Sequence, residues 1–159
     1  MPLQSSMNPN STNTENLLDV SVIVVSYNTR SCLKICLDSV YQQTAGVSFE
    51  VIVVDNASSD CSPEMITAEF PSAIFIQNET NVGFGAACNI GFARANGKYL
   101  FLLNPDAILL DNVIATLFSI MERYSSNDRI GAAGCILTDS SGKSAISYGR
   151  FLNFGDEIW

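Results

Sequence analysis

Four apolar runs, each followed by a polar cluster, most constrain the fold of this chain. The runs are rich in β-branched residues and nearly free of charge, a pattern typical of strands buried inside a sheet. They lie within residues 19–28, 49–55, 73–78 and 98–104. Helix-like segments separate them, at residues 29–43, 62–70 and 87–97. This alternation predicts an α/β fold: a mostly parallel sheet, wound right-handedly, with helices on both faces.

Local signals place the ends of the helices. Ser62 is the expected N-cap of the second helix, and Gly97 is expected to close the third. Asp111 or Asn112 is expected to cap a fourth helix with apolar residues at helical spacing. Residues 129–149 are expected to form two strands around a Ser-Ser-Gly turn.

The acidic composition excludes one class of partner. Asp and Glu number 16 against 8 Lys and Arg, and the net charge at pH 7 is −8. Proteins that bind nucleic acid usually carry a basic patch, and this sequence has none. An anionic ligand therefore needs local positive charge, from a bound cation or a helix N-terminus.

The cysteines and the N-terminal residues point to an intracellular setting. The five cysteines form no Cys-x-x-Cys pair and the chain has no histidine, which argues against a zinc site and a disulfide framework. Residues 1–18 are polar and lack the basic and apolar regions of a secretory signal, so we expect a disordered tail. No apolar run approaches the ~20 residues that a membrane span needs.

Polar clusters follow all four runs. They are Tyr27 with Asn28, Asp55 with Asn56, the loop at residues 81–85, and residues 104–106. Each cluster alone is compatible with an ordinary turn. Because the carboxyl ends of parallel strands meet at one edge of a sheet, where such folds bind ligands, the four together indicate a binding site.

The charge at these strand ends indicates what would be bound. No segment has the spacing of a P-loop or a dinucleotide fingerprint. Two carboxylates, Asp55 and Asp106, would each repel a phosphate about 4 Å away by several kcal/mol at an effective dielectric of ~20. A Mg²⁺ ion between carboxylate and phosphate reverses that sign. Asp106, held by Pro105, is the predicted metal ligand, and Asp55 the predicted acceptor for N–H or O–H groups of a base or sugar.

The ordered motifs "VSVIVVSYN", "EVIVVDNASSD", "NVGFGAACNIG" and "KYLFLLNPD" resemble the nucleotide-binding half of a family 2 glycosyltransferase with the GT-A fold. The resemblance covers about residues 20–148 and is greatest to the rhamnosyltransferase-like branch. It implies transfer of a sugar from a nucleotide-diphosphate sugar, such as dTDP-rhamnose, with inversion. It also implies Mg²⁺ or Mn²⁺ as cofactor, a saccharide or lipid-linked saccharide as acceptor, and a role in polysaccharide biosynthesis.

The same resemblance assigns individual residues. It implies donor binding by Tyr27, Asn28, Asp55, Asn56, Asn81, Gly83, Phe84 and Asn104, and metal binding by Asp106. Asn104 stands where the family's Asp-x-Asp motif has its first acidic residue. Only Asp106 therefore supplies negative charge at that position.

No residue is assigned as the general base that inverting transfer requires. Asp139 is expected in a solvated hairpin turn, and Asp156 and Glu157 lie at the chain end. The expected organisation is therefore a tail at residues 1–18, a nucleotide-sugar-binding domain at 19–150, and at 151–159 the start of a missing acceptor-binding half. Peripheral membrane contact would come through that half, and the expected location is the cytoplasm or the inner face of the membrane.

Two other functions remain open. The first is a non-catalytic nucleotide-binding module left by truncation. The second is a nucleotidyltransferase, which shares a nucleotide-binding α/β sheet but usually has a glycine-rich, basic first loop. The first loop here, "SYNTRS", contains one Arg and no Gly.

Overall fold

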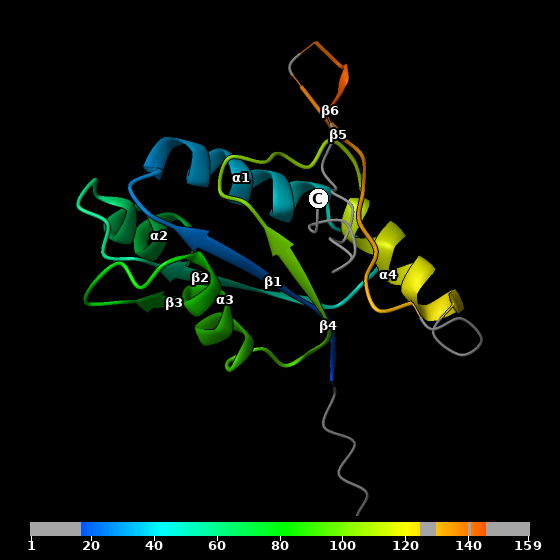
Figure 1. Cartoon of the computed structure of the whole chain (residues 1–159), viewed down its shortest axis with the longest axis horizontal. Helices are drawn as coiled ribbons and strands as arrows, with labels where there is room; N and C mark the ends of the chain where they lie inside the picture. The colour runs from blue at the N-terminus through cyan, green and yellow to red at the C-terminus, as the bar shows by residue number, and fades with distance from the viewer. Residues whose placement is uncertain (1–16, 125–129, 140, 146–159) are drawn as a thin grey trace, which may run out of the picture. The chain divides into compact units, whose positions relative to one another are not determined.

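The computed structural model describes residues 17–124, 130–139 and 141–145 (Figure 1). The chain divides into two units, Met1–Phe118 and Ser119–Trp159, and each is described by itself. The elements in chain order are β1 Leu18–Ser26, α1 Arg30–Gln43, β2 Phe49–Asp55, α2 Ser62–Glu69, β3 Ile74–Gln77, α3 Phe84–Phe92, β4 Gly97–Leu103, α4 Val113–Tyr124, β5 Leu137–Thr138 and β6 Ser144–Ala145. None of the described helices is long and apolar enough to cross a membrane.

The first unit contains the predicted parallel sheet. Its four strands are ordered β3-β2-β1-β4, and every neighbouring pair is parallel. Ser26 pairs with Asp55, and Asp55 pairs with Gln77, so three strands end in the same row. The chain moves outward from β1 to β3 and then crosses to β4 on the other side of β1. The strand order therefore reverses beside the ends of β1 and β4, the position at which α/β sheets bind ligands.

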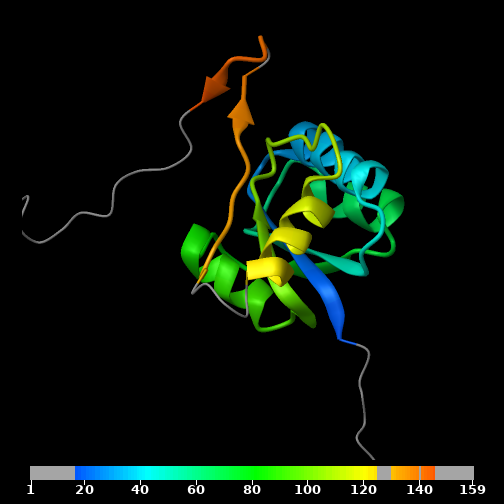
Figure 2. The ribbon, with the colours of Figure 1, turned by 90° about the vertical axis from the view of Figure 1, so that its right-hand side faces the viewer.

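Helices cover the two faces of this sheet through separate clusters of buried side chains. On one face Val22 and Val24 of β1 pack with Leu33 and Leu37 of α1. On the other face the buried cluster contains Ile23 of β1 and residues of α3. Figures 1 and 2 show α1 and α3 on opposite sides of the strands. The predicted arrangement of a parallel sheet with helices on both faces is confirmed.

The second helix begins differently from the prediction. Ser62 is the first residue of α2, and the N-cap is Cys61, whose φ is 60°. Asp60 explains the difference, because its Oδ1 accepts hydrogen bonds from the backbone N–H of Ser62 over 3.1 Å and from its hydroxyl over 2.5 Å. The carboxylate of Asp60 thus supplies the acceptor that Ser62 was expected to provide, and the prediction for Ser62 was wrong by one position.

The third helix ends earlier than predicted. α3 ends at Phe92, and Gly97 is the first residue of β4 rather than a helix cap. A Cβ at Gly97 would lie 2.3 Å from the backbone nitrogen of Ser21, so glycine is required there by the close approach of β1. The Gly97 N–H donates to Ser21 Oγ over 2.8 Å. The glycine that marked a helix end in the sequence marks a strand contact in the fold.

The described part of the second unit contains the predicted hairpin. β5 and β6 are antiparallel, with Leu137 opposite Ala145. Asp139 Oδ1 accepts from the backbone N–H groups of Ser141 over 2.9 Å and Lys143 over 3.1 Å. The Ser141 hydroxyl also donates to this carboxylate. Its hydrogen bond, followed by those of the two backbone N–H groups, holds the pKa of the Asp139 carboxyl below 3.8. This exposed carboxylate stabilises the turn.

Candidate functional site

The predicted site residues lie in the four loops that leave the carboxyl ends of the strands. Tyr27 and Asn28 follow β1, and Asp55 ends β2. Residues 78–83 follow β3, and residues 104–112 follow β4. The common direction of the strands brings all four loops to one edge of the sheet (Figure 1). The structure thus gathers these residues at one edge, as the sequence predicted.

Backbone strain is concentrated in the first two of these loops. Among the described residues, the non-glycine residues with positive φ are Asn28 at 53°, Ala57 at 64° and Cys61 at 60°. Left-handed backbone at a residue with a Cβ costs about 1–2 kcal/mol. Such strain persists only where surrounding contacts enforce it, and it tends to cluster at functional sites.

Hydrogen bonds between the first two loops enforce this geometry. The backbone N–H of Asn28 donates to Ser58 Oγ over 2.8 Å. In return, Asn28 Oδ1 accepts from the backbone N–H of Ser59 over 2.8 Å. Asn28, predicted to bind the donor, therefore uses its amide oxygen to join the loops after β1 and β2. The role in donor binding stays a prediction.

Asp60 makes a second connection between the same loops. Its Oδ2 accepts from the backbone N–H of Arg30 in the first turn of α1 over 2.8 Å. Burial acts to raise the pKa of the Asp60 carboxyl, but the hydrogen bonds from Ser62 and Arg30 outweigh it and lower that pKa below 3.8. Asp60 was not among the predicted site residues. The run "SSD" after β2 was the only sequence signal that pointed to it.

Asp55 is the buried carboxylate of the site. Its side chain has no exposed surface. Oδ2 accepts from the backbone N–H of Ser58 over 2.8 Å, whereas Oδ1 has no hydrogen-bond partner. A buried acceptor without a partner costs about 1–3 kcal/mol, and more when it is charged. Thr44 Oγ1, at the C-terminal end of α1, is also buried and unpaired, so an orphan atom alone does not define a site.

The position of Asp55 Oδ1 distinguishes it from the unpaired Oγ1 of Thr44. It lies at the end of a central strand, in the row formed by Ser26, Asp55 and Gln77. The strained loop that contains Ala57 follows it directly along the chain. Two partners fit this atom: a buried water, or an N–H or O–H group of a ligand that displaces part of that loop.

The Asn56 side chain is buried and hydrogen-bonded within the protein. It is 2% exposed, and its Oδ1 accepts from Asn78 Nδ2 over 2.8 Å. Its Nδ2 donates to the carbonyl of Gly83 over 3.5 Å, and its backbone N–H donates to the carbonyl of Ser26 over 2.8 Å. The amide therefore connects the β2 end to the loop before α3. Direct donor contact by Asn56 stays a prediction, while Asn78 is a connecting residue that the sequence analysis missed.

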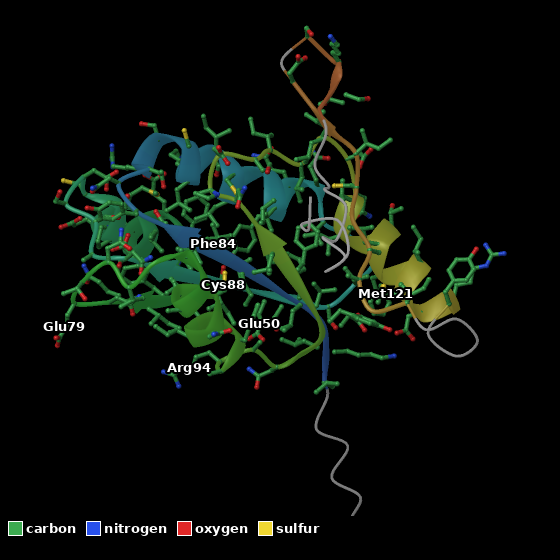
Figure 3. The ribbon with its side chains drawn as sticks, in the orientation of Figure 1. Glu50, Glu79, Phe84, Cys88, Arg94 and Met121 are labelled. Carbon is green, nitrogen blue, oxygen red and sulfur yellow. The ribbon has the colours of Figure 1, made fainter. Side chains whose placement is uncertain are left out.

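The loop before α3 carries exposed groups. Gly83 has a φ of 83°, and its N–H donates to Asn81 Oδ1 over 2.9 Å. Phe84 begins α3 and is 56% exposed, and Tyr27 is 49% exposed. Figure 3 shows Phe84 near Cys88 on α3, away from Arg94. Exposed rings such as these can stack on a base or a sugar.

The Asn-Pro-Asp segment follows β4. The carbonyl of Asn104 accepts from the backbone N–H of Ala107 over 3.1 Å and from Cys36 Sγ over 3.5 Å. Asn104 and Asp106 are exposed. Burial, and after it the charge of Asp106, raises the pKa of the Cys36 thiol from 9.0 to about 12. The contact between Cys36 and the Asn104 carbonyl joins this segment to α1.

The loop that carries this segment ends at the cap of α4. The helix begins at Val113, and the carbonyl of Asn112 accepts from the backbone N–H of Thr116 over 3.1 Å. Asn112 is therefore the cap position, one of the two that the sequence predicted. Its side-chain Nδ2 donates to the carbonyl of Ala45 over 2.9 Å, which ties this end of the loop to the chain after α1.

The oxygen atoms of Asn104 and Asp106 fit a metal site that a bound ligand completes. Within the described ranges, no group of three or more Cys, Asp or Glu side chains could hold a metal ion. A site built from those protein ligands alone is therefore not formed there. Mg²⁺ commonly takes one or two protein carboxylates and completes its shell with substrate phosphate oxygens and waters. Asp106, with the Asn104 amide oxygen as a neutral neighbour, fits such a ligand-completed site.

Two shallow hollows flank these loops. One, of about 380 Å³, is lined by Asn28, Thr29, Arg30, Ser31, Cys32 and Asp60. The other, of about 310 Å³, is lined by Ala57, Ser58, Gln77, Asn78 and Glu79. Asp55 lines neither and is fully buried, so a ligand reaches it only if neighbouring groups move. Of the three acidic residues considered as a base, Asp139 lies in the hairpin turn, and Asp156 and Glu157 fall outside the described residues.

Comparison with protein families finds one matching model. Residues 21–147 match Glycosyl transferase family 2. The chain is 30% identical over 114 residues to glycosyltransferase GlyA of Streptococcus pneumoniae, covering 70% of this chain and 16% of that protein. It is 34% identical over 108 residues to an uncharacterized glycosyltransferase of Haemophilus influenzae, covering 65% of this chain and 35% of that protein. The chain thus spans well under half of either relative.

Solved structures share the fold. The chain superposes on S. aureus TarS 1–349 in complex with UDP-GlcNAc with a TM-score of 0.62, at 24% identity, over 68% of this chain and 32% of that one. It superposes on the mannosyltransferase PcManGT of Pyrobaculum calidifontis, in complex with GDP-Man and Mn²⁺, with a TM-score of 0.55. That pair is 28% identical and covers 60% of this chain and 29% of the other.

Proposed function

The chain belongs to glycosyl transferase family 2, and on that premise we propose that it is the donor-binding part of a glycosyltransferase. In this proposal a nucleotide-diphosphate sugar binds at the carboxyl edge of the sheet, in the loops that hold Asp55 and Asp106. The sugar is transferred to a saccharide or lipid-linked saccharide. TarS in its UDP-GlcNAc complex and PcManGT in its GDP-Man complex, two proteins of like fold, support a nucleotide sugar as the ligand.

The observation that carries the proposal is the unpaired Oδ1 of Asp55. This atom is a buried, charged acceptor at the end of a central strand. Nucleobases and sugars offer N–H and O–H donors, and a donor that reached Oδ1 would form a charge-assisted hydrogen bond. The strained loop of Ala57 would move aside to admit it.

The proposal gives Asp106 the role of metal ligand. A bound Mg²⁺ or Mn²⁺ would neutralise the diphosphate and its developing charge as the sugar leaves. Asp106 would hold that cation, and Asn104 would accept or donate hydrogen bonds beside it without adding charge. The exposed rings of Tyr27 and Phe84 would contact the base or the sugar. Asn81 and Gly83 would shape the loop that lies along the nucleotide.

Finer parts of the proposal rest on the sequence resemblance. They are dTDP-rhamnose as the donor, inversion at the anomeric carbon, and a role in polysaccharide biosynthesis. Inversion requires a base that deprotonates the acceptor hydroxyl, and no described carboxylate is assigned to it. A cytoplasmic location and contact with the inner face of the membrane belong to the same group of proposals.

A non-catalytic nucleotide-binding module is the second candidate, because no described carboxylate is assigned as the base.

A calorimetric screen tests the donor site. UDP-GlcNAc, GDP-mannose and dTDP-rhamnose are each titrated into the chain, once with Mn²⁺ and once with EDTA. We expect one donor to bind more tightly than the other two, and more tightly with Mn²⁺. Hydrolysis or transfer of the bound sugar by this chain would exclude the module. Failure of all three to bind would refute a donor site.

A further inference from the structure

Ser39 is a polar residue at a core position of α1. It is 6% exposed and lies close in sequence to Leu37 and Val40, which belong to the buried cluster on this face of the sheet. A serine inside a helix can bond to the preceding turn, and Ser39 Oγ donates to the carbonyl of Cys36 over 2.7 Å. That bond leaves its oxygen free to accept another.

The second hydrogen bond of Ser39 reaches the segment that carries Asp106. The backbone N–H of Leu109 donates to Ser39 Oγ over 3.0 Å, across 70 residues of sequence. Both residues are buried, and the Leu109 side chain belongs to the same core cluster. Without the hydroxyl, a buried N–H would lose its partner, which is unfavourable. Ser39 therefore fixes the chain at Leu109.

The opposite end of the segment is held by the same helix. Leu103 ends β4 and is 9% exposed. Next to it, the carbonyl of Asn104 accepts from the Cys36 thiol over 3.5 Å. Cys36 and Ser39 lie about one turn apart on α1 and hold the two ends of residues 104–109. The exposed Asp106 carboxylate lies between the two anchors.

We propose that Ser39 is a positioning residue for Asp106. By holding the Leu109 N–H, it fixes the far end of the segment that begins at Asn104, and so limits where the carboxylate can move. A cation that takes one protein carboxylate and several phosphate oxygens depends on that carboxylate standing in one place. The inference rests on the proposed cation role of Asp106.

The test measures the affinity of the full chain for the nucleoside diphosphate of the donor selected by the screen, with Mn²⁺ and with EDTA. The ratio of the affinity with Mn²⁺ to the affinity with EDTA reports the cation site. The affinity with EDTA alone reports the rest of the site. We expect Ser39→Ala to lower the ratio about fivefold or more and to leave the EDTA affinity within about twofold. Hydrogen exchange at the Leu109 amide should accelerate in the same variant.

Two further variants provide controls. Ser39→Thr keeps a hydroxyl and should retain most of the ratio. Thr67→Ala removes a hydroxyl that bonds the carbonyl of Pro63 within α2, outside the site loops, so the ratio should not change. If Ser39→Ala does not fold, Cys36→Ala tests the other anchor, and a lower ratio is again expected.

The outcomes are distinct. If the wild-type ratio is above one and Ser39→Ala has the same ratio, the positioning role is overturned and the proposed function is kept. An equal loss of both affinities in Ser39→Ala also overturns it, because that result shows a general structural role. A wild-type ratio of one overturns the cation role of Asp106 and the positioning role together.

Discussion

The backbone N–H of Ser58 donates to Oδ2 of Asp55 over 2.8 Å, and Oδ1 of the same carboxylate has no partner. One half of the carboxylate thus holds its own loop in place. The other half is a buried charged acceptor at the edge of the sheet where the strand order reverses.

Asp55→Asn should weaken nucleotide binding in the absence of metal. The amide keeps an oxygen for the Ser58 N–H and presents its NH₂ group where the ligand's donor would lie. Loss of a charge-assisted hydrogen bond costs about 1.5–3 kcal/mol, so the dissociation constant in EDTA should rise roughly 10–100-fold. Calorimetry with Asp38→Asn, a partly exposed position on α1, is the control. An unchanged dissociation constant together with altered thermal stability would indicate that a buried water is the partner.

Asp106→Asn should remove the metal dependence of binding and preserve the fold. Asp106 is exposed, so loss of its charge should leave the melting temperature nearly unchanged. The ratio of affinities with Mn²⁺ and with EDTA should fall to about one, because the amide cannot neutralise the cation. Asp111→Asn changes another exposed carboxylate in the same loop and should keep the ratio. The metal role fails if both variants behave alike.

Ala57→Gly should stabilise the protein. Ala57 has a φ of 64°, which a glycine adopts without steric cost. We expect the free energy of unfolding to rise by about 0.5–1 kcal/mol in urea denaturation. The matched exchange Ala68→Gly, at an exposed position of α2, should instead lower it by up to about 1 kcal/mol. Equal losses in both variants would show that the loop after β2 stores no strain.

Gly97→Ala should destabilise the sheet. The added Cβ would lie 2.3 Å from the Ser21 nitrogen and 2.6 Å from the Val20 carbonyl carbon, and backbone atoms cannot turn away as a side chain can. We expect a loss of about 3 kcal/mol or more in the free energy of unfolding. Gly85→Ala, where an added Cβ meets nothing within 4 Å, is the control and should cost little. Similar melting temperatures for the two variants would contradict the close approach of β4 to β1.

The sequence predicted the parts of the fold that depend on local patterns. The apolar runs identified all four strands of the sheet, and the polar residues after them identified the edge that gathers the loops. The Asn-Pro-Asp segment was recognised because a proline and a carboxylate interrupt two apolar runs. Each of these signals lies within a few residues of the feature it predicts.

Features that depend on contacts between distant segments could not be predicted. The role of Ser39 left no signal in the sequence, because its partner Leu109 is 70 residues away. The hydrogen bonds of the Asn56 amide to Asn78 and Gly83 left no signal in the sequence either, because those partners lie 22 and 27 residues away. The apolar run of β4 looked buried on both faces, yet Leu100 and Leu102 are 48% and 49% exposed.

The central claim is that the nucleoside diphosphate of the donor binds at the carboxyl edge of the sheet. Hydrogen exchange with and without the diphosphate of the selected donor and Mn²⁺ tests it most directly. We expect added protection at residues 55–60, 78–85 and 104–109, and none at residues 94–97 on the opposite edge. Protection at residues 94–97, or no change at the three loops under saturating ligand, would contradict the claim.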